Sequence, residues 1–188
     1  MRNAAGYTQV QISGSAKSRG TAWGKRSRAH AAEATKWLHG YILDVGSNDG
    51  WASEIFKRKG FKTLGVDINP IRVVEALEHN MPTLCLDVNK LWLLDGTLMV
   101  DCVFCSHTLE HVPKPQSALA QLGQITLYRM FIVVPIEPKD KVENDAHYFR
   151  FDSVEAFENI VPHGWRILKH WTTNRGEPEM VFVLEREY

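Results

Sequence analysis

The stretch ILDVGSNDGWASEIFKRKGFKTLGVDINP, residues 42–70, decides the fold class of this chain. An apolar run stops near an acid, Asp44, opens into small residues, and leads into a segment whose apolar residues are spaced as in a helix. The apolar-to-acid pattern then returns and ends at Asp67. Two parallel strands need a crossover connection between them, and a helix is the usual one. The stretch therefore predicts a β-α-β unit with an acid at the tip of each strand.

The rest of the chain continues this alternation. Further apolar, strand-like runs occupy residues 83–87, 100–106 and 128–135, with a helix predicted over 117–125. Two final strands, 165–171 and 179–187, are joined by a connection too short for a crossover helix, so they must pair antiparallel. The predicted fold class is α/β: a doubly wound, mostly parallel seven-stranded sheet with an antiparallel C-terminal hairpin.

The chain divides into two predicted units, a flexible basic arm over residues 1–28 and a ligand-binding domain over 29–188. The arm is rich in Gly, Ser, Lys and Arg and lacks periodicity. Two interpretations of it stay open, a solvated tail or an arm that folds over a bound ligand. The domain would begin with a short helix over 31–39, with Ser27 as an upstream cap and Gly40 as the stop.

A second predicted helix follows Asn69 and Pro70, a capping residue before a proline at the first helical position. It carries Ile71, Val74 and Leu77 along one stripe, the pattern of a helix that packs its apolar side on a core.

Composition and charge limit the kinds of protein that this chain can be. Its 188 residues are 44% hydrophobic, and 22 basic residues balance 22 acidic ones. The chain therefore lacks the excess positive charge of a protein that neutralises nucleic-acid phosphates along a broad face. No segment approaches the roughly 20 apolar residues of a membrane span, and the first residues lack the apolar core of a signal peptide. We expect a cytoplasmic protein.

The three cysteines, Cys85, Cys102 and Cys105, all lie in apolar strand-like runs. This placement favours buried, reduced thiols over disulfides. Residues three apart on a strand point to opposite faces, so we do not expect Cys102 and Cys105 to share a metal ion.

The acids at the strand tips indicate the ligand. An acid beside a glycine-rich loop would repel a diphosphate, whereas Asp44 favours a ligand with a cationic group. Asp67 is placed to accept hydrogen bonds from ribose hydroxyls, and Asp87 from an exocyclic amine beside the apolar wall of Val88. S-adenosylmethionine carries all these groups. The predicted cofactor-binding residues are Asp44, Gly46, Ser47, Asn48, Gly50, Trp51, Asp67, Ile68, Asp87, Val88 and Ser106.

Four segments together carry a family resemblance: ILDVGSNDG (42–50), GVDINP (65–70), CLDVNKL (85–91) and VDCVFCSHTLEHV (100–112). In this order they resemble the successive motifs of class I S-adenosylmethionine-dependent methyltransferases. The resemblance implies that Gly46 and Gly50 approach the methionine part of the cofactor and that Ser106 and His107 line the face where the methyl group is transferred. One departure is Asn48, where many members have glycine.

The segment SHTLEHV, residues 106–112, supplies the predicted reactive groups. Methyl transfer needs an aligned nucleophile and a group that takes its proton, and histidine is a suitable base. His107 is the first candidate, followed by His111 and His147. In a helix, His107, Glu110 and His111 would share one face, with ligand types that suit a metal.

Glu110 and His111 also resemble the Glu-His pair of metal-dependent O-methyltransferases that act in ubiquinone biosynthesis and on small-RNA 3′ ends. The predicted metal set is therefore Glu110, His111, His107 and His147, although His107 stands where those families have an acid. The same string occurs in methyltransferases that bind no metal, so this interpretation stays open.

The favoured function is methyl transfer to an oxygen of a small metabolite or sugar, with nitrogen or carbon as less favoured targets. The alternatives are a catalytically inactive binding module, an RNA 2′-O-methyltransferase, and a nicotinamide dehydrogenase. The last is disfavoured by the acids in the loop.

Overall fold

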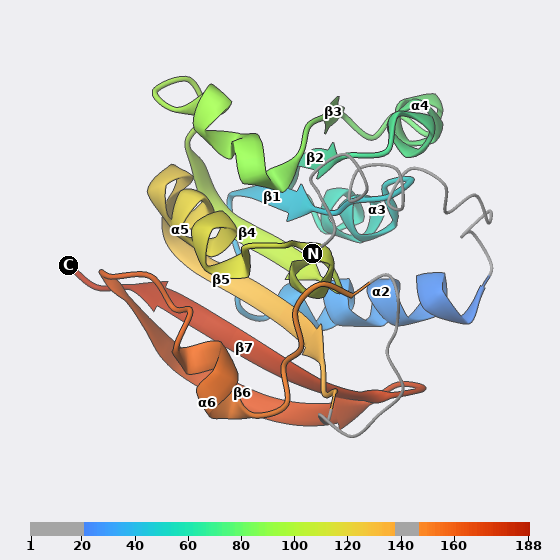
Figure 1. The fold of residues 1–188 in the computed structure, drawn as a ribbon. Helices are drawn as coiled ribbons and strands as arrows, with labels where there is room; N and C mark the ends of the chain where they lie inside the picture. The colour runs from blue at the N-terminus through green and yellow to red at the C-terminus, as the bar shows by residue number, and fades with distance from the viewer. Residues whose placement is uncertain (1–20, 138–146) are drawn as a thin grey trace.

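The computed structural model describes residues 21–137 and 147–188, which include one seven-stranded sheet of order β3-β2-β1-β4-β5-β7-β6 (Figure 1). Its strands are β1 (Tyr41–Val45), β2 (Lys62–Asp67), β3 (Thr83–Cys85), β4 (Val100–Ser106), β5 (Thr126–Pro135), β6 (Trp165–Asn174) and β7 (Pro178–Arg186). Strands β1 to β5 pair in parallel, and β7 lies antiparallel between β5 and β6. The predicted fold class is confirmed.

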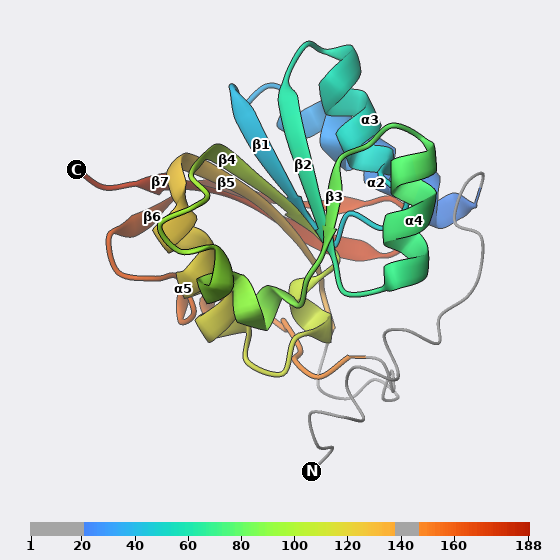
Figure 2. The ribbon, with the colours of Figure 1, turned by 90° about the horizontal axis from the view of Figure 1, so that it is seen from above.

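Helices cover both faces of the sheet. They are α2 (Ala22–Ala34), α3 (Trp51–Arg58), α4 (Pro70–Glu78), α5 (Pro115–Ile125) and α6 (Val154–Glu158), with the 3-10 helices η1 (Val88–Leu94) and η2 (Leu109–His111). Seen from above, α2 and α3 lie on one side of the sheet and α5 on the other (Figure 2). Each side has its own apolar core, because alternate residues of every strand point to opposite faces.

The cysteines follow this alternation. Cys102 belongs to the core under α2 and α3, whereas Cys105 belongs to the core on the opposite face. Both are buried free thiols, which confirms that they point away from each other. Cys85 is also a free thiol, but it is exposed, so the prediction that it is buried was wrong. It lies on β3, which has only one neighbouring strand.

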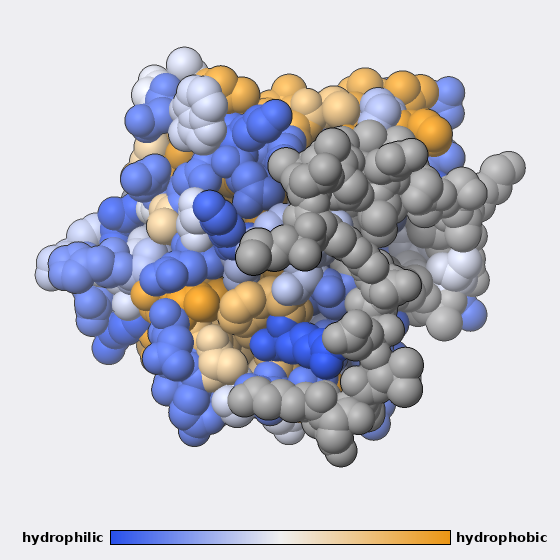
Figure 3. Space-filling model, in the orientation of Figure 1, coloured by the Kyte–Doolittle hydropathy of each residue, from blue (hydrophilic) through white to orange (hydrophobic). Residues whose placement is uncertain are grey.

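Helix α4 begins as predicted and packs differently. Asn69 caps it through Oδ1, which accepts a hydrogen bond from the backbone N–H of Ile71 at 3.0 Å. The predicted stripe faces away from the core, since Ile71, Val74 and Leu77 are 56%, 54% and 51% exposed. Figure 3 shows apolar residues gathered at the upper right of the molecule, where Figure 1 places α4. The side of α4 that is buried carries Arg72, Val73 and Ala76 instead. A helix at the edge of a sheet packs through few residues, so its pattern predicts the buried side poorly.

The first described helix starts nine residues earlier than the predicted one. Helix α2 begins at Ala22, after Thr21, whose Oγ1 accepts a hydrogen bond from the backbone N–H of Gly24 at 3.3 Å. Ser27 lies inside the helix and does not cap it. The end of the predicted arm is therefore helical, and residues 1–20 lie outside the described part of the chain. In the part that the structure describes, no helix combines the length and the apolar character needed to cross a bilayer.

Candidate active site

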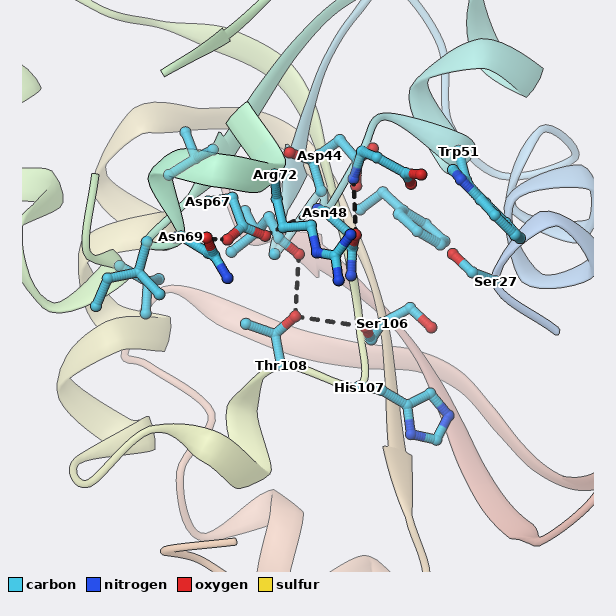
Figure 4. A pocket seen from close by; sticks show the side chains of 18 of the residues that line it. Ser27, Asp44, Asn48, Trp51, Asp67, Asn69, Arg72, Ser106, His107 and Thr108 are labelled. Atoms are coloured by element: carbon cyan, nitrogen blue, oxygen red, sulfur yellow. Dashed lines mark hydrogen bonds between the residues drawn. The ribbon is translucent and has the colours of Figure 1, made fainter. Parts of the chain in front are cut away.

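A pocket opens beyond the carboxyl ends of β1, β2 and β4, where the strand order reverses (Figure 4). Residues from the ends of these strands, from the loops that follow them and from α2 line it. Doubly wound sheets bind their ligands at this point, because the loops diverge there and leave a crevice. The sequence motifs at residues 44–50, 67–69 and 106–108 are therefore brought together by the topology of the sheet.

The loop after β1 turns sharply because three residues have positive φ angles: Gly46 at 68°, Asn48 at 52° and Gly50 at 85°. A side chain at Gly46 would collide with Thr108, since a Cβ atom would lie 2.1 Å from Thr108 Oγ1. Asparagine tolerates a left-handed conformation better than most residues, which is why Asn48 can replace glycine. Gly50 does not line the pocket. It precedes α3, and a Cβ atom there would meet Met81 at 2.6 Å.

Asp67, at the end of β2, holds this loop in place. Its Oδ2 accepts a hydrogen bond from the backbone N–H of Asn48, and its Oδ1 accepts one from that of Asn69, both at 2.8 Å. Burial raises the pKa of Asp67, while the two N–H groups lower it. Each carboxylate oxygen has a second lone pair, so Asp67 can also accept hydrogen bonds from a ligand in the pocket.

Asp44, in β1, is a buried acid with an unusual pKa. It is 2% exposed, and its Oδ2 accepts hydrogen bonds from the backbone N–H of Ser53 at 3.0 Å and from the Ser53 hydroxyl at 2.7 Å. Burial raises the pKa of Asp44 to about 7, although the hydrogen bonds from Ser53 lower it. A positive charge placed beside this carboxyl would favour its ionised form. The pocket therefore suits a cationic ligand at this point.

Two buried polar atoms at the pocket indicate that a polar ligand belongs there. Ser47 Oγ and Trp51 Nε1 belong to pocket-lining residues and have no hydrogen-bond partner within residues 21–137 and 147–188. Buried polar atoms in native proteins are nearly always hydrogen-bonded, so these two atoms are available to bind a molecule or water in the pocket. Together with Asp44 and Asp67, they offer donors and acceptors to a ligand that carries hydroxyl and cationic groups. These residues fit S-adenosylmethionine.

Most predicted cofactor-binding residues line the pocket: Asp44, Gly46, Ser47, Asn48, Trp51, Asp67, Ile68, Val88 and Ser106. Of the predicted cofactor-binding residues, Asp87, like Gly50, does not line the pocket. Its Oδ1 accepts hydrogen bonds from the backbone N–H and the side-chain amide of Asn89, at 2.9 and 2.8 Å, and so caps η1. Its neighbours Leu86 and Val88 line the pocket in its place.

The contribution of α2 and α4 to the pocket was missed. Gly24 and Ser27, which were assigned to the arm, line it. Gly24 lies so close to Trp51 that a Cβ atom there would overlap the indole ring, at 1.0 Å from the nearest atom. Arg72 of α4 also lines the pocket, and its Nη1 is 2.7 Å from Glu75 Oε2. One signal was available in the sequence: Thr21 is a good N-cap residue ten positions before the start of the predicted helix.

On the opposite side of the pocket, His107 lies between two buried acids. Its Nε2 is 2.9 Å from Glu179 Oε1, and its Nδ1 is 3.3 Å from Glu110 Oε1. Although burial lowers the pKa of His107, the two carboxylates raise it to about 9. At neutral pH such an imidazole already carries both protons and has no lone pair for a third. The assignment of His107 as general base stays a prediction, and its protonation at neutral pH disfavours it.

Glu179 of β7 joins this histidine to α2. It is fully buried, its Oε2 is 2.9 Å from His30 Nε2, and its Oε1 is 3.2 Å from Arg26 Nη1. Despite burial, the hydrogen bonds with His107 and His30 hold the pKa of Glu179 well below its usual range. His30 Nδ1 is 3.2 Å from the Oγ of Ser106, which lines the pocket. Sequence reasoning missed both His30 and Glu179, since 149 residues separate them.

The four predicted metal ligands divide into two places. Glu110, His111 and His147 offer ligand atoms that lie within 4.8 Å of one another, whereas the nitrogens of His107 face Glu179 and Glu110. Glu110 is fully buried, and neither of its carboxylate oxygens meets a well-aligned hydrogen-bond donor in the described parts of the chain. His111 lines the pocket and its ring contacts that of His147 edge-on, with centroids 4.7 Å apart. His147 is not among the residues that line the pocket.

The order of the strands and the position of the pocket are those of the class I methyltransferase fold. The family model of the methyltransferase domain matches residues 22–161. The chain therefore belongs to the methyltransferase domain family. The sequence-based identification as a class I enzyme that uses S-adenosylmethionine is confirmed at the level of the family.

Comparison with known proteins agrees with this assignment. Two similar curated proteins are ubiquinone biosynthesis O-methyltransferases. The one from Photorhabdus laumondii is 34% identical over 89 residues, which are 45% of this chain and 37% of the relative. The one from Pseudoalteromonas translucida is 28% identical over 130 residues, which are 65% of this chain and 52% of the relative. The chain thus spans about half or less of the length of each of these relatives.

Among solved structures, a similar one is the magnesium protoporphyrin IX methyltransferase of Synechocystis PCC 6803 with bound S-adenosylhomocysteine. The two chains superpose with a TM-score of 0.68 at 15% identity, over 98% of this chain and 96% of the other. At this identity the comparison shows the shared fold, and the roles of individual residues have to be argued from the site itself.

Proposed function

We propose that this protein transfers the methyl group of S-adenosylmethionine to an oxygen atom of a small hydroxylated molecule. The observation that carries this proposal is the pair of acids, buried Asp44 and half-buried Asp67, at the carboxyl ends of adjacent strands in a pocket whose other side is formed by Ser106 and His107. The similarity to O-methyltransferases supports oxygen as the target atom.

In this proposal the cofactor lies across the ends of β1, β2 and β4. Asp67 accepts hydrogen bonds from the ribose, Ile68, Leu86 and Val88 contact the adenine ring, and Asp44 attracts the cationic end of the molecule. S-adenosylmethionine supplies a methyl group that is electrophilic because it is bound to a positively charged sulfur. The protein has to hold the acceptor oxygen close to that carbon and in line with it, which converts a bimolecular reaction into one within a complex.

Calorimetric titration tests the cofactor assignment. S-adenosylmethionine and its demethylated product should both bind, whereas NAD should not, because its diphosphate would lie beside Asp44 and Asp49 in the loop. The matched control is Asp67→Ala, which should weaken the binding of both adenosine ligands. Tight binding of NAD together with no response to the other two would refute the proposal.

Transfer of label from methyl-tritiated cofactor tests the acceptor class. The acceptors would be catechol, glucose and total RNA, each with the wild-type protein and with Asp67→Ala. We expect label in one of the small hydroxylated compounds. Label in RNA alone would instead identify an RNA 2′-O-methyltransferase, and cofactor binding without any labelled product would favour an inactive binding module.

We also propose that Glu110, His111 and His147 hold a divalent cation, with His107 outside the set. Glu110 is fully buried, and its ion pair with His107 at 3.3 Å is not a well-aligned hydrogen bond, so a cation beside the carboxylate would stabilise it further. His147 Nδ1 lies 2.7 Å from Glu137 Oε1, so Nδ1 carries the proton and Nε2 the lone pair that a metal needs. Two nitrogens and one oxygen suit Zn²⁺ or Fe²⁺ better than Mg²⁺. A cation there would lower the pKa of a coordinated hydroxyl.

Elemental analysis of untagged protein tests the cation site, followed by calorimetric titration of the chelated protein with Zn²⁺ and Mg²⁺. We expect about one Zn²⁺ per chain and at least tenfold weaker binding in Glu110→Gln. His163→Gln, which removes an exposed histidine, is the control and should bind as the wild type does. Zinc binding that is unchanged in Glu110→Gln would refute the assignment.

A further inference from the structure

His30 occupies a position that the reaction proposed above leaves without a role. It is fully buried on α2, and its two nitrogens face different partners. Nε2 lies 2.9 Å from Glu179 Oε2, and Nδ1 lies 3.2 Å from Ser106 Oγ. Ser106 is partly exposed and lines the pocket, on the same side as Ser27 and His107 in Figure 4. Ser106, His30 and Glu179 thus form a continuous chain of hydrogen bonds from the pocket to a buried acid.

The protons in this chain can be assigned from its chemistry. Glu179 is ionised, since Arg26, His30 and His107 all surround its carboxylate, and a carboxylate can only accept. The hydrogen on His30 is therefore on Nε2 and is donated to Glu179. Nδ1 then carries the lone pair and accepts the hydroxyl hydrogen of Ser106. This is the arrangement by which an acid, a histidine and a hydroxyl activate one another in hydrolases.

The surroundings keep His30 in this neutral form. Burial lowers its pKa, and the charges of His107 and Arg175 act in the same direction, while the bond with Glu179 opposes them. The ring of His107 stacks on that of His30 with centroids 5.8 Å apart. A positive charge on His30 would therefore lie next to the charged ring of His107 as well as next to the carboxylate of Glu179. His107, by contrast, has a carboxylate next to each of its nitrogens.

We propose that His30 is the terminal proton acceptor of the methyl transfer, reached through the hydroxyl of Ser106. This inference rests on the proposed function and deepens it. The acceptor oxygen forms a bond to the methyl carbon while the carbon–sulfur bond breaks and its electron pair goes to sulfur. The hydroxyl proton of the acceptor passes to Ser106 Oγ, and the proton of Ser106 passes to His30 Nδ1. The resulting imidazolium is paired with Glu179, and the proton leaves to solvent after the product is released.

The assignment explains two features of α2. A helix that only covered the sheet would not need a fully buried histidine, yet His30 faces Ser106, Glu179 and the ring of His107. Arg26, one turn earlier in α2, donates a hydrogen bond to the carboxylate of Glu179 and so holds it in position to bind His30. Helix α2 therefore supplies the end of a proton path as well as part of the pocket wall.

Nitrogen NMR of the wild-type protein tests this proposal without any methyl acceptor. In long-range proton–nitrogen spectra at pH 7, with His30→Gln used for assignment, Nδ1 of His30 should be unprotonated and Nε2 protonated. Ser106→Ala should shift the Nδ1 resonance, because its hydrogen bond is lost. A protonated Nδ1 at pH 7 would overturn the proposal, since that nitrogen could not take a proton from Ser106.

Kinetics with methyl-tritiated cofactor and catechol as the probe acceptor give the second test. His30→Gln and Ser106→Ala should each lower kcat at least about 100-fold, with KM for the cofactor and Kd for S-adenosylhomocysteine within about threefold of the wild type. The wild-type kcat should level off as pH rises above the pKa of His30, and this break should vanish in His30→Gln. His163→Gln should behave as the wild type. A retained break and unchanged kcat in His30→Gln would overturn the proposal.

The two tests separate this proposal from the proposed function. If neither adenosine ligand binds in the calorimeter, the proposed function fails, whatever the spectra show. If both ligands bind and the spectra show a protonated Nδ1, the proton path fails and the methyltransferase assignment stands.

Discussion

The pocket has two walls that the chain assembles in different ways. The cofactor wall, formed by Asp44, Gly46–Asn48 and Asp67, comes from one β-α-β unit. The histidine wall consists of Ser106 and His107, which line the pocket, and of His30 and Glu179, which are buried behind them and bind them; it joins residues that are 76 and 149 positions apart in the sequence. The first depends on local turns and on the register of adjacent strands. The second exists only when α2, β4 and β7 are all in place, so it depends on the whole tertiary structure.

The largest effect on stability is expected from a substitution that removes the acid of the histidine wall. Glu179→Gln removes the buried carboxylate that Arg26, His30 and His107 share, while Arg26 keeps Glu177 and His107 keeps Glu110. This change should lower the free energy of unfolding by about 3 kcal/mol. Urea unfolding measures it. Glu185→Gln is the matched control, because Glu185 also pairs with two cations, Arg129 and Arg166, but its side chain is partly exposed, near the end of β7. That change should cost no more than about 1 kcal/mol. Equal losses in the two variants would contradict the difference between the walls.

The next largest effect is expected on the affinity for the cofactor, from a substitution in the cofactor wall. Asp67→Ala removes the acceptor of two loop N–H groups and the proposed ribose ligand, so Kd for S-adenosylhomocysteine should rise roughly 100-fold. Calorimetric titration measures it. Asp87→Ala is the control, because Asp87 caps η1 outside the pocket lining, and it should change Kd less than threefold. A large effect of Asp87→Ala would restore the adenine contact that was predicted from the sequence.

A smaller effect is the pH dependence of binding. The pKa of Asp44 is raised to about 7, so the free protein gains a proton there as pH falls below 7. A cationic ligand favours the carboxylate and lowers that pKa, so binding below pH 7 has to release a proton. Affinity for S-adenosylmethionine should therefore rise roughly tenfold between pH 6 and pH 8 and then level off. Calorimetry at several pH values checks this, and Asp44→Asn should remove the contribution of Asp44. The same rise in that variant would assign it to another group.

The smallest effect concerns the loop backbone. Asn48 has a φ angle of 52°, and its Oδ1 accepts a hydrogen bond from the backbone N–H of Asp49 at 2.9 Å. Asn48→Gly keeps the positive φ angle and loses this one hydrogen bond, so Kd for S-adenosylhomocysteine should change less than threefold. Asn48→Val, a β-branched residue that resists this conformation, should weaken binding far more. Similar values for the two variants would show that the loop does not need a left-handed residue at this position.

The cofactor wall could be predicted from the sequence because its signals are local. An apolar run that ends near an acid marks the tip of a strand, and the carboxyl ends of parallel strands lie at one edge of the sheet. This placed Asp44 and Asp67 of the cofactor wall, and also Ser106 of the histidine wall, correctly in the pocket lining. The same reasoning did not place Gly50 and Asp87 in the pocket lining, because a turn or a helix cap uses the same residue types as a ligand contact does.

The histidine wall could not be predicted because no local pattern pairs His30 with Glu179. Each looks ordinary in its own segment, a histidine among alanines and a glutamate at the start of an apolar strand. A charged residue in a strand that is otherwise buried was the one available signal, and it names no partner. His107 illustrates the same limit: its position was predicted correctly, but its pKa depends on Glu179, which is brought there by the fold.

The buried link between α2 and β7 has a consequence for how the protein is made. During translation, His30 leaves the ribosome long before Glu179, which follows 149 residues later. Until β7 inserts between β5 and β6, Arg26 and His30 have no buried carboxylate, so α2 lacks this anchor on the sheet. We expect a nascent chain that lacks β7 to expose α2 to proteases, and the proton path to be complete only after the sheet has closed around its antiparallel strand.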